Sequence, residues 1–285
     1  MDQFRRIINR IGHVLWIALL MTACNNHGQP ASTLPRPDHI VIVLEENKHF
    51  AQIIGNPNAT YINYLASHGA LFPRSFGITH PSQPNYLALF SGDTQGVTDN
   101  ACPYTFTNEN LGSKLLGAKL TFGSFSESMP SVGFSDCASG LYVRKHNPCV
   151  NWQEVNIPAS VNMPFSSFPT DFTQLPTVSL VIPNLKNDMH DGTIKAADAW
   201  LYNNLNPYVQ WAKTHNSLLI VTWDEDDNAG DNKIATIFVG PLVKTGVYDQ
   251  HIDHYNILRT ILDMYGVVPF GNSVTAAPIK NVWIQ

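Results

Sequence analysis

The fold is decided by HIVIVLE at residues 39–45 and by SLLIVTWDEDD at residues 217–227. Each stretch is an apolar run, rich in β-branched residues, that ends in carboxylates. Such runs are typical of strands that are buried on both faces of a sheet. Helical patterns and further strand patterns alternate along the rest of the chain. We therefore expect an α/β fold with a mainly parallel central sheet and helices on both faces.

The other elements follow from the periodicity of the apolar residues. Further strands are expected at residues 120–125, 178–182 and 233–239, and helices at residues 61–70, 84–90, 111–118 and 254–265. Another helix is expected from about Thr193 through Trp211, with an interruption at Pro207 because proline lacks the backbone donor. Residues 126–173 have little periodicity and are expected to form a long excursion over the functional end of the sheet.

The composition is that of a globular protein of 285 residues, 44% hydrophobic and 14% charged. A chain of this length can bury the core of one large domain. The formal net charge of -5 provides no basic surface for nucleic acid, so we expect no nucleic-acid partner. Any phosphate chemistry needs local positive charge, which the sequence RKH at residues 144–146 supplies.

The N-terminus is typical of an export signal, because Arg5, Arg6 and Arg10 precede a short apolar stretch and small residues. The sequence LMTAC, which ends at Cys24, resembles a bacterial lipobox, although an ordinary signal peptide stays open. We expect a lipoprotein-type signal peptide at residues 1–23, a flexible tether at residues 24–37 and a single catalytic domain at residues 38–285. The protein would be exported, and either anchored to a membrane by an N-terminal lipid, in the periplasm or at the cell surface, or secreted.

The cysteines of the domain can form disulfides, because export implies an oxidising compartment. Cys102 and Cys137 bracket a segment rich in Gly and Ser and are the preferred pair. Cys149 is left over and could pair with either of them, so the connectivity stays open at this point.

Carboxylates follow both central strands. Glu46 and Asn47 come after the first strand, and Asp224 and Glu225 come after the second. The carboxyl ends of parallel strands meet at one edge of the sheet, where ligands bind. A single acid there would be interpreted as a solvated loop residue, but several together repel one another unless a cation lies among them. Oxygen ligands favour one divalent ion of the Mg²⁺, Ca²⁺ or Mn²⁺ type.

A serine and several histidines are further candidates for the site. Ser82 opens an expected helix, so it is either a helix cap or a metal-activated nucleophile. His80, His146, His190 and His254 each lie near a polar or charged residue in the sequence. A histidine paired with an acid can keep its proton near neutral pH and donate it to a phosphoryl oxygen or a leaving group.

Several motifs together resemble those of a known family. They are EEN at residues 45–47, HPSQPNYLAL at 80–89, RKHNP at 144–148, NDMHDG at 187–192 and IVTWDEDD at 220–227. In this order they resemble the bacterial and fungal acid phosphatase/phospholipase C phosphoesterases of the alkaline phosphatase superfamily. The resemblance runs from Pro37 to the C-terminus and is nearest to secreted mycobacterial acid phosphatases, whose substrates include phosphoinositides. It implies an alkaline-phosphatase-like fold.

The resemblance also implies roles for individual residues. The metal ligands would be Glu46, Asn47, Ser82, Asp224 and Glu225, with Asp226 as an alternative to Glu225. The catalytic residues would be Ser82, which forms a phosphoserine, and His190 and Asp191. The residues that bind the substrate would be Asn100, Lys145, His146, Asp188 and His254. Asn184 and Asp188 are poor replacements for the zinc ligands of two-metal relatives, so we expect one ion and histidines that bind phosphate directly.

The expected function is that of a monomeric, metal-dependent phosphomonoesterase that acts on phosphoinositides or other small phosphate esters. A phospholipase C-like phosphodiesterase, which acts on a lipid head group with the same nucleophile, stays open as an alternative. A surface-binding lipoprotein without activity is an alternative of another class. Its signature would be a missing nucleophile or a broken acidic pair, but in this sequence the serine and both acidic pairs are present.

Overall fold

The structure, a computed structural model, describes residues 34–284. The predicted signal peptide and residues 24–33 of the predicted tether lie outside the described residues. Residues 34–37 of that tether lie against the domain. Leu34 is buried in the hydrophobic core, and the guanidinium of Arg36 lies 5.1 Å from the centre of the Tyr265 ring.

The central element is an 8-stranded sheet. Its strands are β1 (His39–Glu45), β2 (Ala70–Leu71), β4 (Phe122–Ser126), β7 (Asn162–Pro164), β8 (Val178–Ile182), β9 (Ser217–Trp223), β11 (Thr236–Val239) and β12 (Gly246–Val247). They lie in the order β12-β2-β11-β9-β1-β8-β4-β7. From β7 to β9 all neighbours are parallel, whereas β11 is antiparallel to both β9 and β2. The prediction of a mainly parallel sheet is confirmed.

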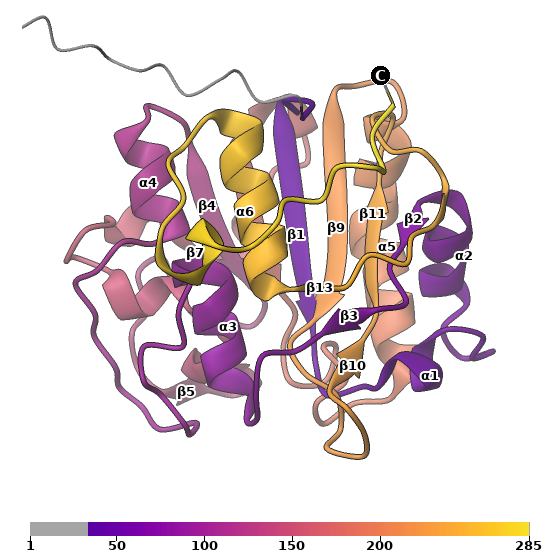
Figure 1. Cartoon of the computed structure of the whole chain (residues 1–285). Helices are drawn as coiled ribbons and strands as arrows, with labels where there is room; N and C mark the ends of the chain where they lie inside the picture. Colours follow the sequence, from indigo (N-terminus) through magenta and orange to yellow (C-terminus); the bar gives the residue numbers. More distant parts are fainter. Residues whose placement is uncertain (1–33, 285) are drawn as a thin grey trace, which may run out of the picture. The chain divides into compact units, whose positions relative to one another are not determined.

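Helices cover both faces of this sheet (Figure 1). They are α1 (Phe50–Ile53), α2 (Thr60–His68), α3 (Ser82–Ser91), α4 (Leu111–Gly117), α5 (Ile194–Ala212) and α6 (His254–Tyr265). Ile42 of β1 belongs to one core cluster, with apolar residues of α3, α4 and α6. The next residue, Val43, belongs to the opposite cluster, with residues of α1, α2 and α5. Successive side chains of a strand point to opposite faces, so an all-apolar strand requires both layers.

Helix α5 is continuous, and the predicted interruption at Pro207 is wrong. Proline removes one backbone donor, which leaves the carbonyl of Asn203 without its helical partner. Both Asn203 and Pro207 are exposed, so water can reach this carbonyl. Leu205 and Tyr208, on either side of the proline, are buried in the core and hold the helix together.

The strand predicted at residues 233–239 is two strands in different sheets. β10 (Lys233–Ile234) pairs with β3 (Ser75–Phe76) in a 3-stranded sheet that also contains β13 (Ile252–Asp253). β11 pairs with β9 in the large sheet. Thr236 lies at the change of sheet, where its hydroxyl is 2.7 Å from those of both Ser75 and Thr222.

The excursion expected at residues 126–173 is ordered by short elements. They are the hairpin β5 (Ala138–Ser139) and β6 (Tyr142–Val143), strand β7, and 3-10 turns at Arg144–His146, Cys149–Trp152, Ala159–Val161, Phe165–Ser167 and Phe172–Gln174. A last 3-10 turn, Gly271–Val274, follows α6. The predicted disulfide between Cys102 and Cys137 is confirmed, and Cys149 is a buried free thiol.

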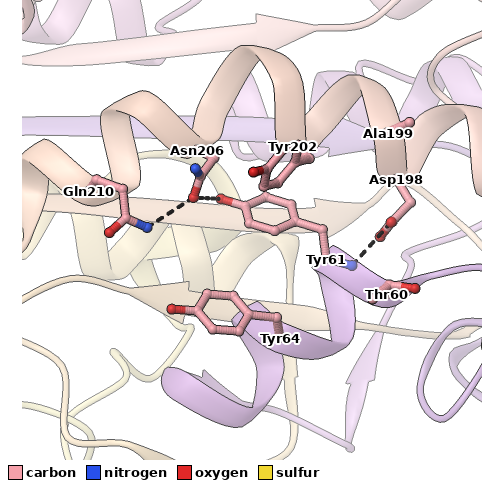
Figure 2. A pocket seen from close by; sticks show the side chains of 8 residues that line it. All are labelled: Thr60, Tyr61, Tyr64, Asp198, Ala199, Tyr202, Asn206 and Gln210. Carbon is pink, nitrogen blue, oxygen red and sulfur yellow. Dashed lines mark hydrogen bonds between the residues drawn. The ribbon is translucent and has the colours of Figure 1, made fainter.

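Helices α2 and α5 pack through a buried carboxylate and enclose a side cavity (Figure 2). Asp198 of α5 accepts hydrogen bonds from the backbone N–H groups of Tyr61 and Ile62, at 3.0 and 2.8 Å. The cavity has a volume of about 520 Å³ and is lined by Thr60, Tyr61, Tyr64, Asp198, Ala199, Tyr202, Asn206 and Gln210. None of the predicted site residues lines it, so the carboxylate cluster lies elsewhere.

Strands β1 and β9 end side by side. Glu45 is in register with Trp223, and the N–H of Asp224 donates to the carbonyl of Glu45 at 3.0 Å. Glu46 and Asp224 therefore leave the sheet as neighbours, as the sequence predicts. No helix within the described residues is long and apolar enough to span a membrane.

Candidate active site

Ser82 is the first residue of α3 and lies between two carboxylates. Its side chain is 2% exposed, and its Oγ lies 3.1 Å from Glu46 Oε2 and 3.2 Å from Glu225 Oε1. The hydroxyl can donate to either oxygen. Pro81 is the helix cap, without a side-chain hydrogen bond, so the interpretation of Ser82 as the cap is wrong. The structure thus brings together residues that lie more than a hundred positions apart in the sequence.

Asp224 has one oxygen in use and one without a partner. Its Oδ1 accepts hydrogen bonds from the N–H groups of Asn47, at 3.2 Å, and Glu225, at 2.6 Å. Its Oδ2 is buried and has no hydrogen-bond partner among the described residues. Asn47 has φ 49°, in the left-handed region that asparagine tolerates better than most residues. A buried carboxylate oxygen without a donor is a suitable ligand for a cation.

The described residues supply too little positive charge near Asp224 and Glu225 to keep both acids ionised. Burial, and then Glu46 and Glu225, raise the pKa of Asp224 well above its ordinary value. Burial and the charge of Glu46 raise the pKa of Glu225 to about 8. A cation among these oxygens would stabilise the ionised forms of both acids. The donor set therefore fits the divalent ion predicted from the sequence.

His146 lies against the other side of Glu46. Its Nε2 is 2.9 Å from Glu46 Oε1, its Nδ1 is 3.1 Å from Asp188 Oδ2, and its ring stacks on Tyr86. Burial lowers the pKa of His146, but the charges of Glu46 and Asp188 outweigh this effect and raise it to about 9. Burial likewise raises the pKa of Glu46, but His146 brings it down to about 2. The pair therefore carries one charge of each sign near neutral pH.

His190 and Lys145 lie next to this pair. The Nζ of Lys145 is 3.0 Å from His190 Nε2, and His190 Nδ1 is 2.7 Å from the largely exposed Asp191. The backbone N–H of His190 donates to Asp188 Oδ1 at 2.8 Å. Asp188 therefore orients both histidines from within the protein, because its other oxygen faces His146. Lys145, His146 and His190 form the basic side of the site.

Two groups of side chains have the geometry of metal ligands. Potential ligand atoms of Glu46, His146 and His190 all lie within 4.8 Å of one another. Those of His49, Asp226 and Asp231 do so as well. Glu46 joins the basic side to the acidic side of the site, which is formed by Glu46, Asp224 and Glu225. One of its oxygens faces His146 and the other faces Ser82.

The structure places the remaining predicted residues at different distances from Ser82. Asn100 is close, because its Oδ1 accepts a hydrogen bond from the N–H of Gln83 at 3.0 Å. His254 is buried, and its Nε2 lies 2.7 Å from the backbone carbonyl of Asp224. Its recorded contact is thus with the backbone that carries the acids. Direct contact of Asn100 or His254 with a substrate stays a prediction.

Sequence reasoning named His80 as a candidate histidine but did not predict its contact with the acids, and it missed Asn85. His80 lies between Glu225 Oε2, at 2.7 Å, and Asp226 Oδ1, at 3.2 Å. The amide Nδ2 of Asn85 is 3.3 Å from Glu225 Oε2. Both residues belong to the HPSQPN motif, so their spacing around Ser82 was the available signal. Asp226 contacts His80, whereas Glu225 contacts Ser82, which favours Glu225 over Asp226 as the acid beside this serine.

Comparison with known proteins agrees with this geometry. The model of the Phosphoesterase family matches residues 56–268. The phosphatidylinositol-3-phosphatase of Mycobacterium tuberculosis is 51% identical over 259 residues, which cover 90% of this chain and 86% of that protein. The phosphate-repressible acid phosphatase of Penicillium chrysogenum is 30% identical over 251 residues, 82% of this chain and 60% of that longer protein.

Solved structures with low sequence identity share the fold. A protein in the alkaline phosphatase superfamily from Vibrio parahaemolyticus gives a TM-score of 0.59 at 13% identity, over 84% of this chain and 68% of that one. A phosphonate monoester hydrolase from Silicibacter pomeroyi gives 0.56 at 11% identity, over 85% and 76%. The resemblance found in the sequence motifs is confirmed. The chain therefore belongs to the phosphoesterase family and has an alkaline-phosphatase-like fold.

Proposed function

We propose that the chain is a metal-dependent phosphomonoesterase of the acid phosphatase type, with Ser82 as its nucleophile. The observation that carries this proposal is the position of Ser82 Oγ between Glu46 and Glu225. A serine needed only for the helix would face the backbone instead. The names of the mycobacterial and fungal relatives, which are phosphatases, support the same reaction class.

One divalent ion of the Mg²⁺, Ca²⁺ or Mn²⁺ type would be held at the acidic side of the site. The oxygen donors for it are those of Glu46, Asn47, Ser82, Asp224 and Glu225. Such an ion lowers the pKa of a hydroxyl group and offsets the negative charge of phosphoryl oxygens. The unpartnered oxygen of Asp224 and the raised pKa of Glu225 support this assignment.

In this proposal each side chain of the site has its own role in the reaction. Ser82 passes its hydroxyl proton to one of the neighbouring carboxylates, Glu46 or Glu225, and attacks phosphorus. The bond from phosphorus to the alcohol breaks, the alcohol leaves, and water then hydrolyses the phosphoserine. Lys145, His146 and Asn100 stabilise the charge that develops on the phosphoryl oxygens. His190, oriented by Asp191, donates a proton to the leaving group.

The substrate class is a small phosphate monoester, with phosphoinositides as candidates because of the name of the mycobacterial relative. The phospholipase C-like alternative uses the same serine on a diester. The basic side formed by Lys145, His146 and His190 favours a monoester, because a monoester dianion carries one more negative charge than a diester. The binding lipoprotein without activity is disfavoured, since the serine and both acidic pairs are present and close together.

We also propose export, with Cys24 as a lipid anchor, and action as a monomer. The motif around Cys24 supports the anchor. A diacylated N-terminus holds a protein at a membrane more stably than one acyl chain does. The catalytic domain would then act on phosphate esters outside the cytoplasm.

The nucleophile can be tested with Ser82→Ala. We expect kcat for an aryl phosphate to fall by about three orders of magnitude or more, because no other hydroxyl replaces the attacking group. Ser91→Ala is the matched control, since Ser91 is an equally buried serine at the other end of α3 and bonds only to backbone carbonyls and Gln95. Turnover like that of the wild type by folded Ser82→Ala protein would end the covalent mechanism.

The metal can be tested by chelation and with Asp224→Asn. We expect chelation to remove the activity, and the variant to bind the restoring ion about 10- to 100-fold more weakly, because a charged ligand becomes neutral. Activity as a function of ion concentration measures both effects. Asp249→Asn, at an exposed acid paired only with Arg74, serves as the control. Full activity of the metal-free protein would contradict the assignment of the acids.

The preference for monoesters can be tested with Lys145→Ala and His190→Ala. We expect kcat/KM to fall more for a monoester than for the matching diester, because the monoester dianion depends more on the basic side. The difference should correspond to something on the order of 1 kcal/mol of transition-state stabilisation. Lys186→Ala, at an exposed lysine, is the control. Equal losses on both substrates would favour the phosphodiesterase.

A further inference from the structure

Glu225 has a fixed orientation in the site. Its Oε1 lies 3.2 Å from Ser82 Oγ, while its Oε2 lies 2.7 Å from His80 Nδ1 and 3.3 Å from Asn85 Nδ2. The carboxylate is 3% exposed, so it is held by protein groups rather than by water. The contact with His80 is the shortest of these.

The imidazole of His80 is held from its other side. Its Nε2 lies 3.2 Å from Oδ1 of Asp226, which is fully buried. Asp226 in turn accepts hydrogen bonds from the N–H groups of Asn228, at 2.8 Å, and Asn232, at 3.1 Å. Asp226 therefore holds the His80 ring, and this ring in turn contacts Glu225.

The two backbone segments on either side of the ring are also joined. Asn232 donates to the carbonyl of Thr79 at 3.1 Å, and Gly77 donates to the carbonyl of Asn232. A Cβ added to Gly77 would lie 2.7 Å from the side chain of Asn232, so only glycine allows this approach. The segment before the nucleophile and the segment after β9 thus meet at His80.

We propose that His80 is a positioning residue that orients Glu225 toward Ser82 and toward the cation-binding side of the site. The proposal rests on the proposed function, because it assigns Glu225 to the metal. Hydrogen bonds to a ligating carboxylate fix its direction and so determine how well it binds the ion. Within the described residues, the His80 side chain forms no hydrogen bond or ion pair with Ser82 or with a predicted substrate-binding residue.

The test compares His80→Ala with His80→Asn in the purified full-length chain. Asparagine keeps an amide donor near the place of Nδ1, whereas alanine removes it. We expect the dissociation constant of Mn²⁺, measured by calorimetry, to rise about 10- to 100-fold in His80→Ala and to stay within about threefold of the wild type in His80→Asn. Excess Mn²⁺ should restore most of kcat for an aryl phosphate in His80→Ala. His251→Ala, at an exposed histidine whose ring centre lies 4.7 Å from that of Phe76, is the control.

An unchanged dissociation constant in His80→Ala would overturn the proposal and leave the phosphatase assignment intact. Equal weakening in both variants would also overturn it, because the donor at Nδ1 would then not be responsible. The thermal stability of both variants shows whether they fold. If His80→Ala does not fold, Mn²⁺ binding by His80→Asn is the deciding result. A dissociation constant within about threefold of the wild type supports the proposal, and a larger rise overturns it. If the wild type hydrolyses the ester without binding Mn²⁺, the metal assignment fails. The ratio of kcat between the two variants then decides whether His80 positions Glu225 against Ser82.

Discussion

The parallel pairing of β1 with β9 is the constraint on which the site depends. The two strands end in register, so Glu46 and Asp224 leave the sheet at the same place. Neither acid can withdraw to solvent, because both are buried. The cost of holding these charges together in the interior is offset by hydrogen bonds, by His146 and, in our account, by a divalent ion. The location of the reaction is thus set by strand pairing.

The site has an acidic side and a basic side, and Glu46 joins them. One of its oxygens faces Ser82 and the other faces His146. In our account, the acidic side would hold the ion and the basic side would stabilise the phosphoryl group. Burial and Glu46 raise the pKa of Glu225, whereas the pKa of Glu46 is lowered because, within the described residues, the buried His146 lies against it.

Local signals in the sequence predicted much of the fold. Helix α6 has the predicted bounds because Asp253 caps its start and Gly266 ends it in the left-handed conformation. The prediction failed where distant contacts decide the structure. Pro207 stays within α5 because its neighbours are buried, and residues 233–239 divide between two sheets because Thr236 meets partners from both.

The same distinction holds for the site. Glu46, Ser82 and Asp224 were predicted because strand ends and a helix start are visible in the sequence. The role of His80 was not, because it depends on Glu225 and Asp226, which lie far from it in the sequence and reach it only in the folded chain. The resemblance in the motifs indicated the reaction class, whereas the contacts in the structure show which residues surround Ser82 and its neighbouring carboxylates.

The most direct measurement of the central claim is mass spectrometry of protein quenched with acid during turnover of an aryl phosphate. Our account predicts that one phosphoryl group is found on the peptide that contains Ser82, because phosphoserine survives in acid, and on no peptide of the Ser82→Ala variant. A phosphoryl group on another residue instead of Ser82, in this sample or in a parallel sample quenched with alkali, which preserves phosphohistidine, would contradict attack by Ser82.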